Sequence, residues 1–421
     1  MFLRNKNSAR VAHRERHAAT QQTPLNIPMG SPQTEVHWQR FTVAFDYPVM
    51  FTRKAFDPAN SALADALCRW ESDRQHRVAV VIDEGLALAR PDLPERIAAY
   101  AEARQQHVEL ATAPLVLPGG EPCKNDPALL PQLQQWLQHA RIDRQSFLIA
   151  IGGGALLDLA GFAAATTHRG VRLIRMPSTV LAQNDSAVGV KNGINAFGVK
   201  NFLGNFAPPF AVIADFDFLS TLSERDQRAG LAEAVKVAAI RDAGFLDWLE
   251  QHASQLASFA PIATEIMIRR CAALHMAHIG QGGDPFEFGS ARPLDFGHWA
   301  AHKLESLTRH SLRHGEAVAI GMALDARYSV ETGYLAANQA ERLCDLLELL
   351  GFRLWDAALE SIDGHGRPLV MQGLAEFQEH LGGELTLTLL TGLGLGVDVC
   401  GVDSIAMERA LNWLRTREAQ R

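Results

Sequence analysis

The sequence predicts an α/β half followed by a mostly helical half. Up to about Phe218, apolar strand-like runs alternate with segments of helical periodicity, which is typical of a parallel sheet covered by helices. Beyond that residue helical periodicity dominates, and only residues 384–394 look extended. A chain of 421 residues is also too long for one ordinary core. We therefore expect a mobile tail over 1–35, an α/β domain over 36–218 and a helical domain over 219–421.

The first elements of the α/β half follow from periodicity. Residues 41–52 alternate apolar and polar side chains, as in a strand pair or hairpin. Residues 77–87 hold a continuous apolar strand that ends at Asp83, as expected of a parallel strand buried on both faces. Helical period follows over 93–107, strand and turn signals over 108–125, and helical period again over 127–143.

A glycine-rich turn follows the next apolar strand. The stretch "SFLIAIGGG" leads into a helix over 155–168 and a strand over 170–178. Three glycines between a strand and a helix allow close backbone approach to a pyrophosphate, whose charge the helix N-terminus stabilises. The spacing is not G-x-G-x-x-G, so a plain tight turn is an equal interpretation. The turn "PGGEPCKN" adds Glu121 and Lys124, which could contact a ribose or belong to a solvated loop.

Residues 176–209 form a long block that is poor in charge and rich in Ser, Thr, Asn and Gly. Such a stretch inside a compact domain is usually functional. Its charged residues, Asp185, Lys191 and Lys200, are spaced as individual groups and do not form a solvated face. We expect this block to carry ligand-binding side chains.

Histidines are concentrated in residues 292–326. This stretch holds His298, His302, His310 and His314, four of the 16 in the chain. A metal site and a polar helical surface both account for such crowding.

The composition excludes several classes of partner. A net charge of −7 and a pI near 6.1 argue against nucleic acid and anionic membrane surfaces. Five scattered cysteines without a Cys-x-x-Cys pair indicate reduced thiols in a cytoplasm. No apolar run approaches the roughly 20 residues of a membrane span, and residues 1–35 lack the apolar core of a secretory signal.

Five motifs in order resemble the 3-dehydroquinate synthase, or sugar phosphate cyclase, superfamily. They are "IGGGALLDLAGFAAATTHRG", "PSTVLAQNDSAVGVKNGINAFGVKN", "GLAEAVK", "DFGHWAAH" and "RHGEAVAIGM". The resemblance covers roughly residues 40–415. It implies an N-terminal NAD-binding, Rossmann-like parallel-sheet domain, a C-terminal helical metal-binding domain, and an active site between them.

The resemblance also implies roles for individual residues. Three ligands for one divalent metal, zinc or cobalt, fall on Glu233, His298 and His314, which would leave coordination positions open for substrate oxygens. The residues expected to bind NAD are Asp83, Glu121, Lys124, Gly152, Gly153, Gly154, Asp158, Ser178, Thr179 and Thr221. The residues expected to bind or convert the sugar phosphate are Asp185, Lys191, Asn201, Lys236, His302 and His380, together with Arg169. In the family this arginine reaches the neighbouring subunit's site, which implies a homodimer. For His302 a structural hydrogen bond is an equal interpretation, and His310 has no counterpart.

Departures from the family pattern concern the pocket for the substrate carboxylate. Met276 stands at a lysine position if one inserted residue is allowed, and Asp295 replaces an asparagine. Pro293 interrupts an arginine neighbourhood that Arg292 could serve, and His380 replaces a lysine. These changes resemble the 2-epi-5-epi-valiolone synthase branch, which acts on sedoheptulose 7-phosphate, a substrate without a carboxylate. The alternative is 3-dehydroquinate synthase proper, acting on 3-deoxy-arabino-heptulosonate 7-phosphate.

The family chemistry implies that one held NAD oxidises a hydroxyl, that phosphate then leaves by β-elimination, and that hydride return precedes ring opening and aldol closure. Two other classes of protein stay open. A metal-dependent alcohol dehydrogenase shares the architecture but needs no phosphate-binding lysines. A non-catalytic scaffold would not need the intact metal ligands.

Overall fold

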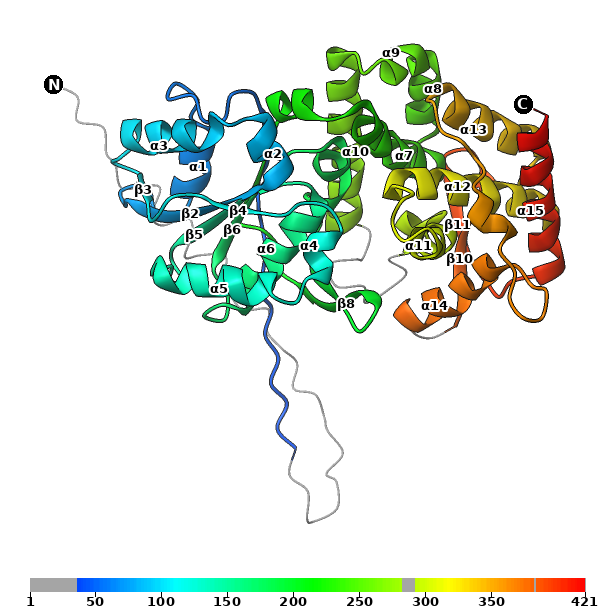
Figure 1. Ribbon diagram of the computed structural model, residues 1–421, viewed down its shortest axis with the longest axis horizontal. Helices are drawn as coiled ribbons and strands as arrows, with labels where there is room; N and C mark the ends of the chain where they lie inside the picture. The colour runs from blue at the N-terminus through cyan, green and yellow to red at the C-terminus, as the bar shows by residue number, and fades with distance from the viewer. Residues whose placement is uncertain (1–35, 282–291, 382–383, 421) are drawn as a thin grey trace, which may run out of the picture. The chain divides into compact units, whose positions relative to one another are not determined.

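The computed structural model describes residues 36–281, 292–381 and 384–420 (Figure 1). The expected tail over 1–35 lies outside the described residues. The chain divides into a first unit up to Phe45 and a second from Asp46 to Arg421. Residues 36–45 form neither helix nor strand, so the hairpin predicted over 41–52 is wrong. Only its last four residues form a strand, β1 (Val49–Thr52), which pairs in parallel with another strand. Pro48, just before β1, has no N–H to donate, and its carbonyl accepts from the Val212 N–H at 2.9 Å.

A seven-stranded sheet forms the N-terminal part of the second unit, in the order β1-β9-β6-β5-β2-β3, with β4 also paired to β2. All of its pairings are parallel. The strands are β2 (His76–Asp83), β3 (Val108–Leu110), β4 (Leu115–Leu117), β5 (Phe147–Gly152), β6 (Arg172–Pro177) and β9 (Ala211–Asp215). Every residue of β5 is buried, which explains why this strand is a continuous apolar run.

Helices cover both faces of this sheet, as the alternating pattern predicts (Figure 1). Val78, Val80 and Ile82 of β2 pack with α1 (Ala62–Cys68) and α3 (Leu93–Ala103). Ala79 and Val81 point the other way, toward α5 (Leu129–His139) and α6 (Gly154–Thr166). The period-two alternation of a strand therefore divides its apolar side chains between two cores. The short helices α2 (Glu84–Ala89) and α4 (Pro122–Asn125) follow β2 and β4.

The middle block contains an antiparallel hairpin that the sequence patterns did not reveal. After a one-turn π-helix, η2 (Ala182–Ser186), the chain forms β7 (Lys191–Ala196) and β8 (Val199–Phe206). The hairpin lies against α6 at Gly161, where an added Cβ would lie only 1.7 Å from the Asn192 amide oxygen. The absence of a side chain at Gly161 therefore sets how closely the hairpin approaches the helix.

The last strand of the sheet ends at Asp215, and the first long helix that follows begins at Glu224. The architecture therefore changes near the expected boundary at 218, although the division into two domains stays a prediction. The helices of the second part are α7 (Glu224–Arg241), α8 (Ala243–Gln251), α9 (Ala253–Ala257), α10 (Pro261–Gln281), α11 (His298–Leu307), α12 (His314–Glu331), α13 (Ala337–Leu349), α14 (Gln372–Leu381) and α15 (Ser404–Ala419). Short 3₁₀ turns, η3 (Phe216–Thr221), η4 (Arg292–Asp295), η5 (Ala357–Glu360) and η6 (Leu369–Met371), join some of them.

Helix α12 lies at the centre of the helical part and contacts α7, α11, α13 and α15. The extended segment forms an antiparallel pair, β10 (Thr386–Gly392) with β11 (Leu395–Cys400). Within the described ranges, no helix has both the length and the hydropathy that crossing a membrane requires.

Candidate metal and cofactor site

Three predicted ligands meet in the helical part. Glu233 lies in α7, His298 is the first residue of α11 and His314 is the first residue of α12. Their ligand atoms all lie within 4.8 Å of one another. The Nε2 atoms of His298 and His314 lie 3.8 and 3.6 Å from the same Glu233 oxygen, Oε1. Residues that are far apart in sequence thus present two nitrogens and a carboxylate to one point, which suits a divalent metal.

The turn before α11 is held by a buried carboxylate. Gly297 adopts a left-handed conformation, φ +79°, that favours glycine. Asp325 of α12 accepts the Gly297 N–H at 2.8 Å and the Trp299 indole N–H at 2.7 Å. An added Cβ at Gly321 would lie 2.0 Å from the Gly297 carbonyl oxygen. Two glycines therefore let α12 pack directly against the turn that places His298.

Each histidine has an oxygen acceptor on its other ring nitrogen. The Nδ1 of His298 lies 3.2 Å from the Phe296 carbonyl, and the Nδ1 of His314 lies 3.1 Å from Oε2 of Glu305. Because both partners accept, Nδ1 carries the hydrogen when the ring is neutral. The Nε2 lone pairs are then free to face Glu233, as metal ligation requires.

The charges around the cluster are strongly coupled. Burial alone would raise the pKa of Glu233, but Lys236 and His314 outweigh it and lower that pKa to about 2. Burial would likewise lower the pKa of His314, but Glu305 and Glu233 raise it to about 9. Burial, assisted by Lys236, holds the pKa of His298 well below its usual value. The negative charges of Glu233 and Glu305 are therefore balanced mainly by Lys236 and His314.

The residues predicted to bind NAD follow the carboxyl ends of the parallel strands. Asp83 ends β2, and its carboxylate caps α2 by accepting from the N–H groups of Gly85 and Leu86. Burial raises its pKa. Gly152 ends β5 beside it, and an added Cβ there would lie 3.0 Å from the Asp83 Cβ. Since β2 and β5 are neighbours whose onward connections diverge, this is the point of a parallel sheet where dinucleotides bind.

The other members of this set lie along the same edge. Gly153 and Gly154 begin α6, and Ser178 and Thr179 follow β6, with the Ser178 N–H bonded to the Gly152 carbonyl at 2.9 Å. Thr221 ends η3, where its hydroxyl donates to the Phe218 carbonyl.

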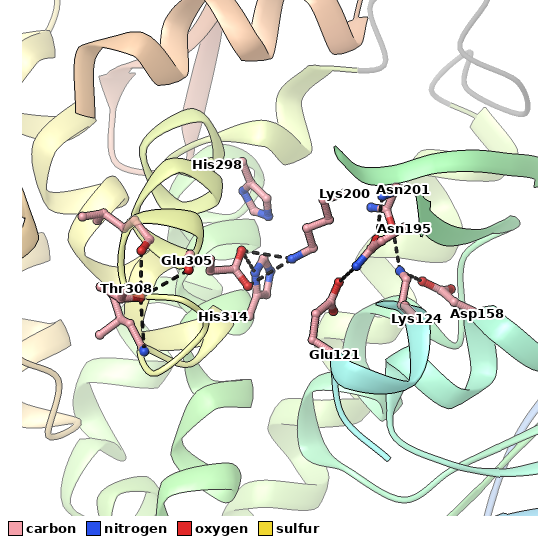
Figure 2. Close-up of polar contacts among 12 residues, drawn as sticks. Glu121, Lys124, Asp158, Asn195, Lys200, Asn201, His298, Glu305, Thr308 and His314 are labelled. Carbon is pink, nitrogen blue, oxygen red and sulfur yellow. Dashed lines mark hydrogen bonds and ion pairs between the residues drawn. The ribbon is translucent and has the colours of Figure 1, made fainter. Parts of the chain in front are cut away.

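A network of polar side chains joins this edge to the hairpin (Figure 2). The Lys124 ammonium donates to Asp158 of α6 at 2.7 Å and also to the Asn201 side chain on β8. Glu121 accepts from the Asn195 amide at 2.7 Å. Burial would raise the pKa of Glu121, but Lys200 and Lys124 outweigh it and lower that pKa. The Asn195 side-chain oxygen also accepts from the Asn201 N–H at 2.8 Å. The predicted residues Glu121, Lys124, Asp158 and Asn201 therefore belong to one connected group.

Two predicted substrate residues lie near the metal cluster. Lys236 is buried one helical turn after Glu233 and forms an ion pair with it. Asp185, on η2, lies 3.0 Å from the Nδ1 of His275 on α10. Burial and Glu233 raise the pKa of Asp185, but Lys236 and His275 outweigh them and lower it. Lys191 begins β7 and is exposed.

The remaining predicted residues lie elsewhere or outside the description. Arg169 is exposed in the loop between α6 and β6, at the amino edge of the sheet, because α6 begins at the carboxyl edge and runs away from it. Its role in a neighbouring subunit stays a prediction. His302 lies one turn after His298, and their ring centroids are 5.6 Å apart. The side chains of His380, Arg292 and Pro293 lie outside the described residues. His310 is exposed.

Three residues that contact this region were missed from the sequence. His275 directly precedes Met276 and is the α10 side chain whose contact with Asp185 is seen. Glu305 lies seven residues after His298, two turns along the same helix face. This spacing could have predicted that its side chain lies on the same side of the helix as His298. Arg175 is completely buried in β6. An arginine inside the apolar run "GVRLIRMPS" could have been recognised as a residue with a special partner.

Arg175 organises the segment that carries the substrate residues. Its guanidinium donates to the carbonyl oxygens of residues 187, 189 and 191 at 3.2, 2.7 and 3.0 Å, and to the Asn192 side chain at 2.6 Å. Burial lowers the pKa of Arg175, but a buried arginine side chain in a protein remains charged. The chain between Asp185 and Lys191 is therefore attached to the core of the sheet.

Together these features define a class of protein. It is a two-part enzyme in which the carboxyl edge of a parallel sheet, lined with glycine, accompanies a buried Glu–His–His cluster suited to a metal. Comparison with known proteins gives the particular family. Residues 114–229 match the 3-dehydroquinate synthase N-terminal model, and residues 230–365 match the 3-dehydroquinate synthase C-terminal model.

Individual relatives agree with these models. The chain is 38% identical over 343 residues to the 3-dehydroquinate synthase of Paracoccus denitrificans (strain Pd 1222), covering 80% of this chain and 89% of that protein. It is 39% identical over 301 residues to the 3-dehydroquinate synthase of Nitrosococcus oceani, covering 71% and 82%. The chain belongs to the 3-dehydroquinate synthase family, whose cyclases are carbon–oxygen lyases acting on phosphates.

Solved structures include similar folds. The 2-epi-5-epi-valiolone synthase of Streptomyces hygroscopicus subsp. jinggangensis 5008, solved with NAD⁺ and Zn²⁺ bound, is 29% identical with a TM-score of 0.79, over 90% of this chain and 100% of that one. A 2-deoxy-scyllo-inosose synthase solved with NAD⁺ and Co²⁺ is 23% identical with a TM-score of 0.70, over 86% and 95%, and shows likeness of fold alone.

Proposed function

We propose that the chain binds NAD and one divalent metal, zinc or cobalt, and cyclises a seven-carbon sugar phosphate with loss of phosphate. The observation that carries the proposal is the convergence of two imidazole Nε2 atoms on one oxygen of Glu233, with Lys236 beside it. The similar synthase solved with NAD⁺ and Zn²⁺ supports both cofactors.

The residues present fit both groups. Glu233 is 1% exposed; its Oε2 forms an ion pair with Lys236, while its Oε1 has no hydrogen bond and faces both imidazole Nε2 atoms, which suits a carboxylate oxygen that ligates a cation. At the sheet edge, an added Cβ at Gly119 would lie 2.0 Å from an oxygen of Asp83. Glycine there lets the backbone come close to the carboxylate that would accept from a ribose hydroxyl.

When bound, NAD accepts and returns a hydride, and the metal polarises a substrate hydroxyl. The chain's own residues would bind and orient the sugar phosphate. Lys236 would supply a fixed positive charge beside the reacting hydroxyls. The Asp185 carboxylate would accept a hydrogen bond from the Nδ1–H of His275 and would be placed to accept a substrate proton. Lys191 and Asn201, on the hairpin, would bind the phosphate through a compact charge and a neutral donor.

For the substrate, we propose 3-deoxy-arabino-heptulosonate 7-phosphate, converted to 3-dehydroquinate. The curated relatives at 38–39% identity support this choice over the heptulose phosphate that the motifs favoured. Met276 stands at the family's lysine position only if one residue is inserted. The adjacent His275 contacts Asp185, which favours His275 for that position. Lys236, near the Asp185–His275 pair, would offer positive charge to a substrate carboxylate.

A second candidate is sedoheptulose 7-phosphate. Burial would lower the pKa of Lys236, but Glu233, Asp185 and, to the smallest extent, Asp295 raise it to about 12. An acid at position 295 would repel a substrate carboxylate. The fold likeness to a 2-epi-5-epi-valiolone synthase, at a TM-score of 0.79, also favours it.

The test offers each sugar phosphate separately to the metal-loaded protein and measures inorganic phosphate and product mass. Preference for the heptulosonate, reduced by His275→Ala more than by Met276→Ala, is the expected result. Preference for sedoheptulose 7-phosphate would overturn the choice of substrate and leave the cyclase proposal standing. NADH accumulation without phosphate release would instead indicate an alcohol dehydrogenase.

We also propose that the protein is a homodimer in which Arg169 serves the neighbouring site, and that it works in the cytoplasm. The five cysteines, all unpaired in the structure, support a reducing compartment. Mixing inactive Arg169→Ala and Lys236→Met proteins tests the dimer, because a shared site would regain part of its activity.

A further inference from the structure

One carboxylate joins a metal ligand to the other part of the chain. Glu305, on α11, is buried, and its Oε2 lies 3.1 Å from the Nδ1 of His314. Both of its oxygens accept from the Lys200 ammonium at 3.0 Å (Figure 2). Glu305 thus connects α11, the first residue of α12 and strand β8.

The two ends of this connection belong to different parts of the fold. Lys200 lies on the hairpin that packs against α6 of the parallel sheet. His314 begins a helix of the helical part. The series Lys200–Glu305–His314 therefore runs from the sheet part of the molecule to the proposed metal.

The chemistry of the carboxylate determines what it does for the imidazole. An ionised carboxylate only accepts hydrogen bonds, so it keeps the proton of a neutral His314 on Nδ1 and the lone pair on Nε2. It also restrains rotation of the ring. Partners of this kind commonly contribute 10- to 100-fold to metal affinity. Lys200 in turn fixes the direction of a carboxylate that would otherwise be buried with one partner.

We propose that Glu305 is the positioning residue for the ligand His314, and that Lys200 fixes Glu305, so that metal affinity depends on a lysine of the hairpin. The inference goes beyond the proposed function and holds for either sugar phosphate. Glu305 touches neither metal nor substrate in this assignment and acts through the imidazole.

The experiment measures zinc affinity by competition with a coloured chelator, and the visible absorption of the cobalt form, without any substrate. Glu305→Ala is expected to weaken zinc binding about 10- to 100-fold and to change the cobalt spectrum. Glu305→Gln keeps an acceptor and should lose less. Lys200→Met should weaken binding by a smaller, measurable factor.

Lys303→Met is the matched control. Lys303 lies on the same helix, is buried like Glu305, and forms an ion pair with Glu376 of α14 at 2.5 Å. This variant loses an ion pair of the same helix away from His314, although Glu376 is more exposed than Glu305, so its zinc affinity should match the wild type. Should Glu305→Ala fail to fold, Glu305→Gln and Lys200→Met decide the matter. Wild-type zinc affinity and an unchanged cobalt spectrum in both would overturn the proposal, as would equal weakening in the Lys303 control.

Discussion

Replacing Asp325 by Asn is expected to remove a pH dependence of stability that this buried carboxyl introduces. Asp325 is 1% exposed and accepts from the Trp299 indole and the Gly297 N–H. Burial raises its pKa from 3.8 to about 7, and the two hydrogen bonds offset only part of that effect. Between these two pKa values the folded protein binds a proton that the unfolded chain has released. The free energy of unfolding therefore falls as pH rises through this window.

The size of the effect follows from the shift. About three pKa units at 1.36 kcal/mol each give roughly 4 kcal/mol between pH 4 and pH 8, as an upper bound. An amide does not titrate, so Asp325→Asn lacks this slope. Asn can accept only one of the two N–H groups through its oxygen, so the variant also carries a pH-independent cost of about 1–3 kcal/mol.

The assay is urea unfolding of metal-free protein at pH 5, 6, 7 and 8, followed by circular dichroism. The wild-type free energy of unfolding minus that of Asp325→Asn should decrease steadily over this range, since other groups cancel in the difference. Asp325→Ala provides a control with the same expected slope and a different offset. Parallel stability curves for the wild type and both variants would refute the reasoning, because they would mean that Asp325 does not take up a proton on folding.

Three further results are expected. His298→Ala should lose its bound zinc in elemental analysis and at least about 100-fold in turnover, because one of three ligands is missing; retained stoichiometric zinc would contradict the assignment. Asp158→Ala should weaken NAD binding, measured by fluorescence titration, with metal content unchanged, and wild-type NAD affinity would leave it only a structural role. Gly161→Val should destabilise the protein by about 1–3 kcal/mol, since its Cβ would overlap the Asn192 side chain. Gly364→Val, with open space around it, is the control for the melting temperature.

The parallel sheet could be predicted because strands that are buried on both faces are continuous apolar runs in the sequence. Strand β5 is apolar at nearly every position and runs into three glycines. The hairpin β7–β8 has no such run. Its two strands pair with each other and pack against α6, and much of β8 is exposed. Polar and small residues therefore occur in these strands as they do in loops. The alternation of apolar and polar residues reflects which side chains are buried. A strand that is only partly buried therefore lacks a recognisable pattern.

The metal residues were found because each lies in its own short motif. Their neighbours were harder to find, since helix geometry turns a one-residue error into a rotation of about 100°. Met276 matches the family's lysine position only with one inserted residue, whereas the neighbouring His275 contacts Asp185. Glu305 could have been inferred from its position on the face of His298, but its partner Lys200 is more than 100 residues away in sequence. No local pattern encodes such a contact.

The buried guanidinium of Arg175 has a consequence for protein engineering. It donates hydrogen bonds to carbonyl groups of the segment from Asp185 to Lys191. The backbone conformation of that segment therefore depends on a side chain of β6, which lies outside it. Exchanging residues 182–206 between related cyclases, the obvious way to transfer substrate preference, would move the ligand-binding side chains without the group that shapes their backbone. A related cyclase with an apolar residue at position 175 would gain the ligand-binding side chains, but its backbone there would lack the hydrogen bonds that Arg175 donates. Chimeras of this kind should therefore be designed with β6 and the hairpin as one inseparable module.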